Sequence, residues 1–324
     1  MIQFDTYLKE AKTVAITGHV RPDGDCLGTT LGFYNYIKEN YPEVLAQVFL
    51  EPAESALSYL PGIDEVCHDL SSALSSYDLL CVFDCGGEAR FEPFQDLITR
   101  AKCILNLDHH LGNTNFAHEI YCVPECSSAC ELLYTCLTDE KITKDVATCL
   151  YTGMVTDTGI FRFQSVTPRT MEIAGALMRK GIDHTRIVDT AYFQKTFAQN
   201  KVLGLALDKA ILFHEDKAIF SYITKQEREA MNLSSSEMGG VIDQLRNTEG
   251  IEVAVFAYEL EENDFKISMR ARDLVDVSLI CNHFGGGGHM RAAGCNMITD
   301  SVDHLLKAVD EQIGLALRRA GLEA

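Results

Sequence analysis

The stretch KTVAITGHVRPDGDCLGTTLGFYNYIKEN, residues 12–40, determines the fold that we expect for the first part of the chain. It opens with an apolar run over 12–19, passes through the turn sequence PDGD at 22–25, and continues with helical periodicity over 27–40. A strand followed by a loop and a helix is the repeating unit of a parallel α/β sheet. Such sheets bind ligands in the loops at the carboxyl ends of their strands. The loop after 12–19 is therefore a candidate functional site.

The same pattern continues through the first two-thirds of the chain. Further apolar runs predict strands, and further periodic segments predict helices: LAQVFL (45–50), DLLCVFD (78–84) and KCILNLD (102–108) for strands, and SACELLYTCL (128–137) and DVATCLYTGMVTD (145–157) for helices. We predict an α/β protein whose N-terminal domain, over 1–185, has a mostly parallel sheet.

From about residue 205 the pattern changes. A hairpin over 209–223, strands over 251–260 and 264–271, a glycine-rich turn, a short strand and a C-terminal helix are expected. We therefore predict a helical linker over 186–204 and a smaller α+β domain over 205–324.

Composition limits the classes of function. The chain has 28 basic and 47 acidic residues, a net charge of −19, which disfavours binding of a long nucleic acid. No apolar run is long enough to span a membrane and the N-terminus lacks a signal peptide, so we expect a cytoplasmic protein with no membrane partner. The 12 cysteines are dispersed through apolar segments, which favours buried thiols over disulfides or a zinc ribbon.

The first motif, GHVRPDGDCLG, concentrates potential ligands. His19, Asp23 and Asp25 lie within seven residues, and Pro22 and Gly24 favour a turn between them. The helix that follows has an N-terminus that attracts anions. The loop could bind cations and phosphate together, although an ordinary polar turn with an aspartate as helix cap is the alternative.

Similar groups end the other predicted strands. Asp84 follows the strand over 78–84, Asp108, His109 and His110 follow the strand over 102–108, and Asp157 ends a helical run. A histidine pair alone is more often structural, but several acidic and imidazole groups at one sheet edge suit divalent Mn, Mg, Zn or Fe. They exceed the needs of one ion, so we expect a site for two cations.

Five motifs in this order resemble a known family. GHVRPDGDCLG (18–28), VFDCGG (82–87), NLDHH (106–110) and GMVTDTG (153–159) resemble the four motifs of the DHH phosphoesterases, and GGGGHMRAAG (285–294) resembles the signature of the DHHA1 domain. Length and domain pair resemble the branch of oligoribonucleases and pAp phosphatases, often called nanoRNases.

The resemblance implies roles for the residues of the first four motifs. His19, Asp23 and Asp157 would hold one divalent cation, Asp25 and His109 the other, and Asp84 would bridge both. Mn²⁺ is the expected metal, with Mg²⁺ or another divalent cation as the alternative.

It also implies two catalytic residues near the ligands. Asp108 would orient His109, and His110 would contact the reacting phosphate or donate a proton to the leaving oxygen.

Substrate binding is expected from the last motif and from arginines. Consecutive glycines let backbone amides approach an anion, although linkers are also rich in glycine. The substrate-binding candidates are Gly286, Gly287, Gly288, His289, Arg291, Arg270 and Arg90; for Arg90 a surface salt bridge is an equal alternative.

The implied activity is metal-dependent hydrolysis of short oligoribonucleotides and linear dinucleotides such as pApA and pGpG to mononucleotides, of pAp to AMP, or of both. A water activated by two metals would act in a cleft between the domains. A homodimer is compatible with the sequence.

Several alternatives are open to test. A sensor that binds nucleotides without cleaving them would be expected to lack one or more ligands. A manganese inorganic pyrophosphatase would carry a basic SRKKQ-type signature, and a RecJ-like exonuclease an extra domain and more positive charge. A Rossmann nucleotide carrier would need a GxGxxG turn after the first strand, which GHVRPDG does not provide.

Overall fold

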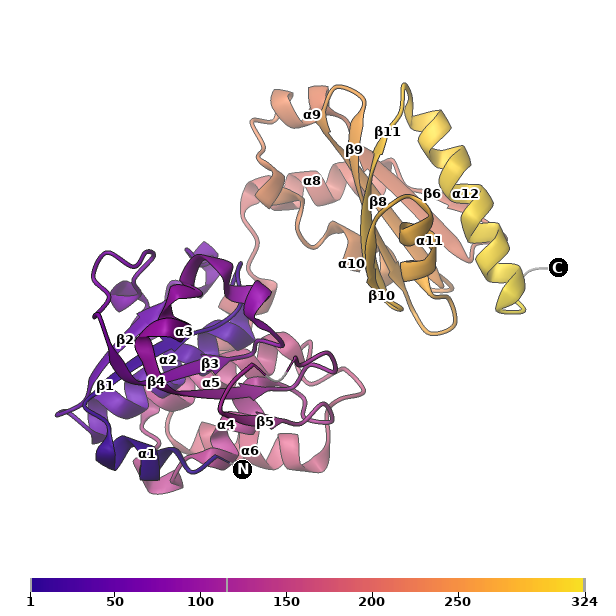
Figure 1. Cartoon of the computed structure of the whole chain (residues 1–324). Coiled ribbons are helices and arrows are strands. Elements are labelled where there is room, and N and C mark those ends of the chain that lie inside the picture. Colours follow the sequence, from indigo (N-terminus) through magenta and orange to yellow (C-terminus); the bar gives the residue numbers. More distant parts are fainter. Residues whose placement is uncertain (1, 115, 323–324) are drawn as a thin grey trace. The chain divides into compact units, whose positions relative to one another are not determined.

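The computed structural model describes residues 2–114 and 116–322 and divides into two units, Met1–Gln194 and Lys195–Ala324 (Figure 1). The segment 186–204, which we predicted to be a linker, is divided between them. Helix α7 (His184–Val188) and a π-helical turn (Asp189–Phe193) belong to the first unit, and α8 (Phe197–Asp208) to the second. Buried Val202 and Ala206 of α8 belong to a core cluster of the second unit.

The first unit is built on a parallel sheet, as predicted. Its strands are β1 (Thr13–Thr17), β2 (Leu45–Phe49), β3 (Tyr77–Phe83), β4 (Ala101–Asp108) and β5 (Glu119–Cys122). They are ordered β2-β1-β3-β4-β5, and every adjacent pair is parallel. The edge strand β5 was not predicted because its sequence, EIYC, is short and only half-buried.

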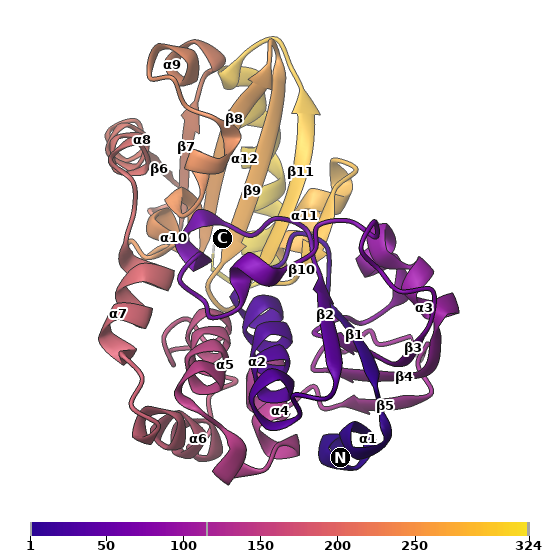
Figure 2. The same ribbon diagram turned by 90° about the vertical axis from the view of Figure 1, so that its left-hand side faces the viewer.

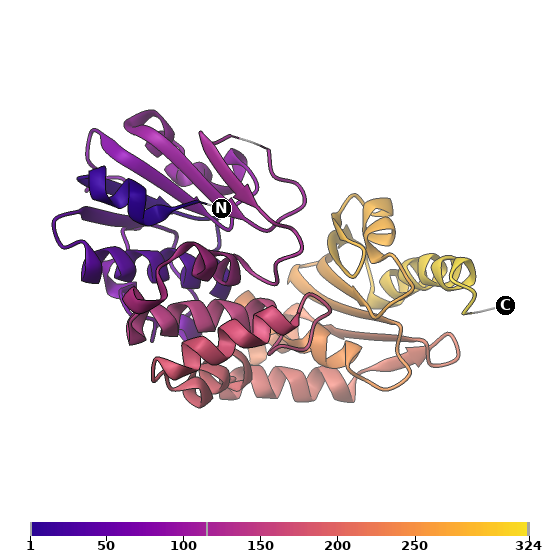
Figure 3. The same cartoon turned by 90° about the horizontal axis from the view of Figure 1, so that it is seen from below.

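Helices of the first unit pack on the sheet (Figure 3). Their bounds are α1 Phe4–Glu10, α2 Gly24–Asn40, α3 Asp96–Arg100, α4 Ala129–Cys136, α5 Lys144–Asp157 and α6 Pro168–Arg179, with 3₁₀ turns at Ser55–Leu57, Ile63–Glu65, Glu88–Phe94 and Asp139–Lys141. Side chains of Asp23, Ser128 and Thr143 accept hydrogen bonds from the first-turn amides of α2, α4 and α5. These caps fix where each helix begins.

The second unit has a six-stranded mixed sheet (Figure 2), in agreement with the predicted α+β fold. Its strands, ordered β10-β11-β9-β8-β7-β6, are β6 Ile211–Phe213, β7 Ala218–Ile223, β8 Val253–Glu261, β9 Asp264–Ala271, β10 Gly287–His289 and β11 Ala292–Ile298. Helices are α8, α9 Lys225–Ala230, α10 Val241–Arg246, α11 Val277–His283 and α12 Val302–Arg319, with a 3₁₀ turn at Ser235–Met238. Among the described strands of this second sheet, only β7 and β8 pair in parallel.

Both faces of this second sheet are covered. Along β8, Val253, Val255 and Ala257 join the core that contains buried residues of α11 and α12. The alternate residues Ala254, Phe256 and Tyr258 join the core that contains residues of α8 and α10. Alternation with period two places successive side chains on opposite faces, so β8 is apolar throughout.

Two further sequence expectations concern the cysteines and membranes. All twelve cysteines lie in the described residues as free thiols, and nine of them are buried. Among residues 2–114 and 116–322, no helix combines the length and apolar character needed to cross a bilayer.

Close contact between α2 and α5 depends on glycine. A Cβ on Gly28 of α2 would lie 2.5 Å from the carbonyl oxygen of Cys149 and 2.9 Å from the Sγ of Cys130. A Cβ on Gly153 of α5 would lie 2.8 Å from Oδ1 of Asp25. The absence of side chains therefore lets these helices approach and fixes the position of the Asp25 carboxylate.

We predict that Gly28→Ala lowers the free energy of unfolding by about 1–3 kcal/mol, because the backbone of Cys149 has to move. The matched variant Gly175→Ala, in α6, should instead raise it by about 0.5–1 kcal/mol, since its new methyl group meets only the end of the Arg179 side chain. Urea denaturation of both variants measures the difference. Equal effects would contradict the packing explanation.

A second constraint ties α1 to the rest of the unit. The carboxylate of Asp5 accepts hydrogen bonds from Tyr36 (2.7 Å), Thr138 (2.7 Å) and Lys141 (3.0 Å). Partial burial acts to raise the pKa of Asp5, but these hydrogen bonds outweigh it and lower the pKa from 3.8 to about 2. The folded state therefore favours the ionised carboxylate.

We predict that Asp5→Asn destabilises the protein at neutral pH and that this loss shrinks on acidification. A lowered folded-state pKa contributes stability that is present above the unfolded value of 3.8 and is lost as the pH falls toward 2. Unfolding of both proteins should be followed as a function of pH. A difference that stays constant over this range would exclude ionisation as its cause.

Candidate metal centre

The predicted site residues of the first unit converge at one edge of its sheet. His19 follows β1, Asp84 follows β3, and His109 follows β4, while Asp157 is the last residue of α5. Strand order reverses direction at β1, which has β2 on one side and β3 on the other. The carboxyl ends of strands at such a switch point form the usual crevice for ligands in α/β sheets.

Two imidazoles are held in matching orientations. Nδ1 of His19 lies 2.9 Å from the carbonyl oxygen of Val20, and Nδ1 of His109 lies 3.3 Å from that of Cys126. With Nδ1 donating to a carbonyl, Nε2 of each ring faces the neighbouring carboxylates and becomes a ligand atom once it loses its proton. In metal sites, a hydrogen bond from Nδ1 to a carbonyl oxygen fixes the tautomer and the orientation of a histidine that binds the metal through Nε2.

Asp84 lies between these imidazoles. Its Oδ2 is 3.4 Å from Nε2 of His19, and its Oδ1 is 3.5 Å from Nε2 of His109. Both distances exceed the usual hydrogen-bond length. The carboxylate is buried, and Oδ1 is one of two buried side-chain polar atoms without a hydrogen-bond partner in the described residues. Asp84 also has a left-handed backbone, with φ of 50°.

Asp25 is anchored by the start of another helix. Its Oδ2 accepts from the amide of Ala129 at 2.6 Å and its Oδ1 from the amide of Cys130 at 3.0 Å, so it caps α4 from α2. Its Oδ2 is also 3.7 Å from Nε2 of His109. The burial of this carboxylate is thus offset by two amides, while it still faces the imidazole.

The structure groups the ligand candidates differently from the resemblance. Oδ1 of Asp23 is 3.6 Å from Nε2 of His19. Asp157, which was expected beside those two, has its Oδ2 3.7 Å from Nε2 of His109 and forms a group with Asp25 and His109. The end of α5 lies next to α2 and α4, which brings Asp157 to the Asp25 side of the cluster.

Burial and mutual repulsion shift the pKa values of these groups. Burial and the nearby carboxylates of Asp84 and Asp157 raise the pKa of Asp25 well above its ordinary value. Burial raises the pKa of Asp157 to about 6, although His109 opposes the shift. For Asp84, burial is outweighed by His19 and His109, and the pKa is lowered.

The pKa values of both histidines are raised by the same carboxylates. Burial lowers the pKa of His19, but Asp23 and Asp84 outweigh it and raise the value to about 10. Asp84, Asp25 and Asp157 likewise overcome burial and raise the pKa of His109 to about 10. Without cations, the cluster therefore retains protons on its imidazoles.

Asp108 has a different partner from the one expected. Its Oδ1 is 2.7 Å from Nδ1 of His110, whereas Nδ1 of His109 faces the carbonyl of Cys126. Residues two apart along an extended chain share a side, which explains why Asp108 orients His110 rather than His109. The hydrogen bond to Asp108 raises the pKa of His110.

Sequence reasoning missed the residues that support this pair. The side-chain amide of Asn113 donates to Oδ2 of Asp108 (2.8 Å) and to Oδ1 of Asn106 (2.7 Å). Asn106 in turn donates to the carbonyls of Val82 and Cys85. The only signal in the sequence was a polar residue inside the apolar strand ILNLD.

The substrate-binding candidates are divided between the two units. Arg90 is exposed on the 3₁₀ turn Glu88–Phe94, and its carbonyl accepts from the amide of Val20 at 2.6 Å. In the second unit, Nε of Arg270 is 3.5 Å from Asp243, and a guanidinium nitrogen of Arg291 is 3.5 Å from Asp273.

The glycine-rich segment was expected to be a turn, but part of it forms a β-strand. Gly287, Gly288 and His289 form β10, which pairs with β11. A Cβ on Gly286 would lie 2.2 Å from the carbonyl oxygen of Gly294, and one on Gly288 would lie 2.5 Å from that of Ala292. Close approach of the two strands therefore requires these two glycines, whatever else the segment binds.

The donor set fits divalent cations. Potential ligand atoms form three overlapping groups, each with its atoms within 4.8 Å: His19, Cys26 and Asp84; Asp84, His109 and His110; and Asp25, His109 and Asp157. Imidazole and carboxylate ligands suit first-row divalent metals. An ion between the rings and Asp84 would give the unpartnered Oδ1 a contact.

Comparison with known proteins supports both units. The sequence profile of the DHH family, N-terminal domain, matches residues 13–154, and that of the DHHA1 domain matches residues 198–315. The bifunctional oligoribonuclease and PAP phosphatase NrnA of Thermus thermophilus is 29% identical over 313 residues, covering 95% of this chain and 91% of that protein. The Bacillus subtilis protein of the same name is 27% identical over 300 residues, covering 91% and 92%.

A solved structure shows the same fold. The exopolyphosphatase-related protein from Bacteroides fragilis superposes with a TM-score of 0.89 at 22% identity, covering 98% of this chain and 96% of that one. The two profile matches show that the chain combines a DHH-family N-terminal domain, over 13–154, with a DHHA1 domain, over 198–315.

Proposed function

We propose that the protein is a metal-dependent phosphoesterase that hydrolyses short oligoribonucleotides and linear dinucleotides to mononucleotides and pAp to AMP. The observation that carries the proposal is the buried Asp84 carboxylate between two imidazoles, with an oxygen that lacks a partner in the described part of the chain. Relatives named as bifunctional oligoribonuclease and PAP phosphatase support the substrate class.

The geometry favours two sets of ligands. His19, Asp23 and Asp84 would hold one cation, and Asp25, Asp84, His109 and Asp157 the other. Mn²⁺ is the expected ion, and Mg²⁺ has the same preference for carboxylate oxygen. When bound, a pair of divalent cations lowers the pKa of water and offsets negative charge on a phosphate.

Protonation of the leaving oxygen would come from a side chain of the protein. Asp108 fixes the ring of His110 through Nδ1, which leaves Nε2 for the substrate. The raised pKa of His110 keeps a proton on this ring at higher pH, as donation to the leaving oxygen requires. We assign proton donation to His110 and its orientation to Asp108.

The net negative charge of the chain favours short substrates over long nucleic acids. With a net charge of −19, the chain offers little attraction to the many phosphates of a long nucleic acid. A few placed cations suffice for a short substrate. We propose Arg90 as a phosphate contact in the first unit, and Arg270, His289, Arg291 and the amides of Gly287 and Gly288 as phosphate-binding groups of the second unit. The amide of Gly286 already donates to the carbonyl oxygen of Cys281 at 2.8 Å.

We predict that binding of Mn²⁺ releases protons and stabilises the protein. Because the pKa values of His19 and His109 are raised to about 10, a cation has to displace about two protons at pH 7. Calorimetric titration in buffers of different ionisation enthalpy measures this number, and the thermal midpoint should rise with Mn²⁺. Affinity should increase with pH.

Two variants identify the source of these protons. His19→Gln should reduce the number released, whereas His304→Gln on α12 should leave it unchanged. Mn²⁺ binding without proton release would mean that the cation binds elsewhere.

We predict that Asp84→Asn lowers kcat/KM for pAp and pApA at least a hundredfold, roughly the loss for an electrostatic group of this kind, while circular dichroism stays unchanged. Asp145→Asn, an exposed aspartate of α5, is the control and should remain active. A substrate panel of pAp, pApA, pGpG, pyrophosphate and a long RNA completes the test.

Other outcomes would point to other functions. Nucleotide binding without turnover in the wild-type protein indicates a sensor. Preference for pyrophosphate or for the long RNA would contradict the proposed substrate class.

A further inference from the structure

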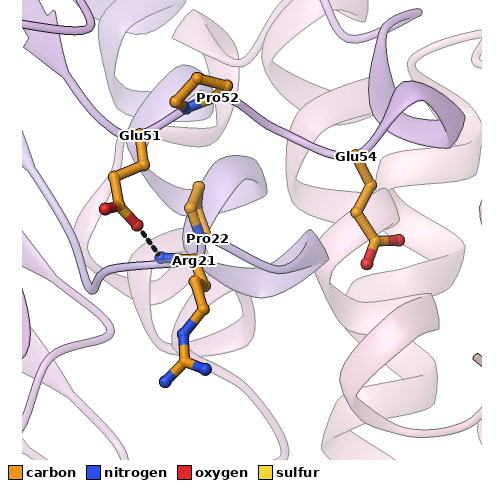
Figure 4. Close-up of a pocket in the computed structure, with 5 residues that line it drawn as sticks. All are labelled: Arg21, Pro22, Glu51, Pro52 and Glu54. Carbon is orange, nitrogen blue, oxygen red and sulfur yellow. Dashed lines mark hydrogen bonds between the residues drawn. The ribbon is translucent and has the colours of Figure 1, made fainter. Parts of the chain in front are cut away.

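A pocket adjoins the candidate metal centre in the first unit. It is lined by Arg21, Pro22, Glu51, Pro52 and Glu54 and has a volume of about 340 Å³ (Figure 4). This volume is within the range of small-molecule sites, roughly 300–1,000 Å³. Its lining comes from two loops, one between β1 and α2 and the other after β2.

Sheet register places this pocket beside the metal centre. β1 and β2 are parallel, with Thr17 paired to Phe49. His19 and Glu51 each lie two residues beyond that pair, at the same edge of the sheet. Neighbouring strands are about 4.8 Å apart, and Arg21 and Pro22 lie between His19 and Asp23 in the chain. A ligand held at the metal centre can therefore extend into the pocket.

The two loops are fastened to each other before any ligand binds. The backbone amide of Arg21 donates to Oε2 of Glu51 at 2.6 Å. Arg21 has a left-handed backbone, with φ of 54°, and the amide of Val20 donates to the carbonyl of Arg90 at 2.6 Å. An uncommon backbone conformation persists where the surroundings enforce it, frequently at ligand sites.

Polar groups of this pocket are free to bind. Figure 4 shows that the side chain of Arg21 extends away from Glu51, so only its backbone is engaged there. Within residues 2–114 and 116–322, the guanidinium of Arg21, Oε1 of Glu51 and the carboxylate of Glu54 make no hydrogen bond or ion pair. The pocket thus offers one cation, carboxylate acceptors and two proline rings.

This combination matches a ribonucleotide more closely than simpler ligands. Two carboxylates repel a lone phosphate, and the arginine disfavours a metal cation. In a ribonucleotide, the phosphate pairs with a guanidinium, ribose hydroxyls donate to carboxylates, and the base offers an apolar face to proline. Carboxylates recognise ribose hydroxyls in the same way in dinucleotide-binding folds.

We propose that this pocket binds the ribonucleoside next to the reacting phosphate, and that Glu51 and Glu54 accept hydrogen bonds from its ribose hydroxyls. The inference rests on the proposed function and adds a specificity: the 2′-hydroxyl is the group that distinguishes RNA from DNA. The pocket makes the enzyme selective for ribonucleotides.

The test compares kcat/KM for pApA and its deoxy counterpart d(pApA) in the Mn²⁺-loaded protein. A hydrogen bond to a charged acceptor changes affinity by roughly tenfold or more, so the wild-type protein should prefer pApA by about that factor. Glu54→Ala, and the double variant Glu51→Gln with Glu54→Ala, should lose this preference mainly through slower cleavage of pApA. Glu43→Ala, another exposed glutamate of the first unit, should keep it.

The outcomes separate the two proposals. If the wild-type protein cleaves neither dinucleotide, the proposed function fails and the specificity fails with it. If it cleaves both equally, or if the double variant retains the wild-type ratio, the phosphoesterase stands and the ribose pocket is wrong. Equal loss on both substrates in the folded double variant would also reject hydroxyl recognition. Thermal unfolding verifies that the variants are folded.

Discussion

The first unit depends on the placement of one buried carboxylate between two imidazoles. Asp84 has Oδ2 near His19 and Oδ1 near His109, at separations that leave space between the groups. Burying a carboxylate is costly unless compensating charges are close. The two rings provide this compensation in the cation-free protein, and their raised pKa values show the same attraction from the histidine side. Divalent cations would replace those protons.

The surrounding fold supports this arrangement by bringing distant segments together. Parallel strands deliver His19, Asp84 and His109 to one edge, and a backbone carbonyl orients each of the two rings. Glycines at 28 and 153 allow α2 and α5 to approach, so that Asp25 can cap α4 and still face His109. Helix packing is therefore part of the chemistry of the site, because a small displacement of α2 would move one of its carboxylates.

The second unit illustrates how a motif can have two explanations. Its glycine-rich segment was expected to bind an anion through backbone amides, yet Gly286 and Gly288 are also required by the approach of β10 to β11. The amide of Gly286 already donates to the carbonyl oxygen of Cys281, so the anion-binding expectation applies to Gly287 and Gly288, which lie on the edge strand β10. In the first unit, no sequence motif indicated a binding role for Arg21 or Glu54. Their role is suggested by the fold, in which two loops line one pocket.

The α/β class, the parallel strands and the set of acidic and imidazole groups could be predicted from the amino-acid sequence, because apolar periodicity and residues at strand ends are local features. Which of these groups face each other became clear from the three-dimensional fold. In the fold, Asp157 lies beside His109 rather than His19, and Asp108 forms its hydrogen bond with His110 rather than His109. The fold also revealed the edge strand β5 and the network of Asn106 and Asn113. Such pairings depend on helix packing and on the direction of neighbouring side chains, and neither is encoded in the spacing of residues along the chain.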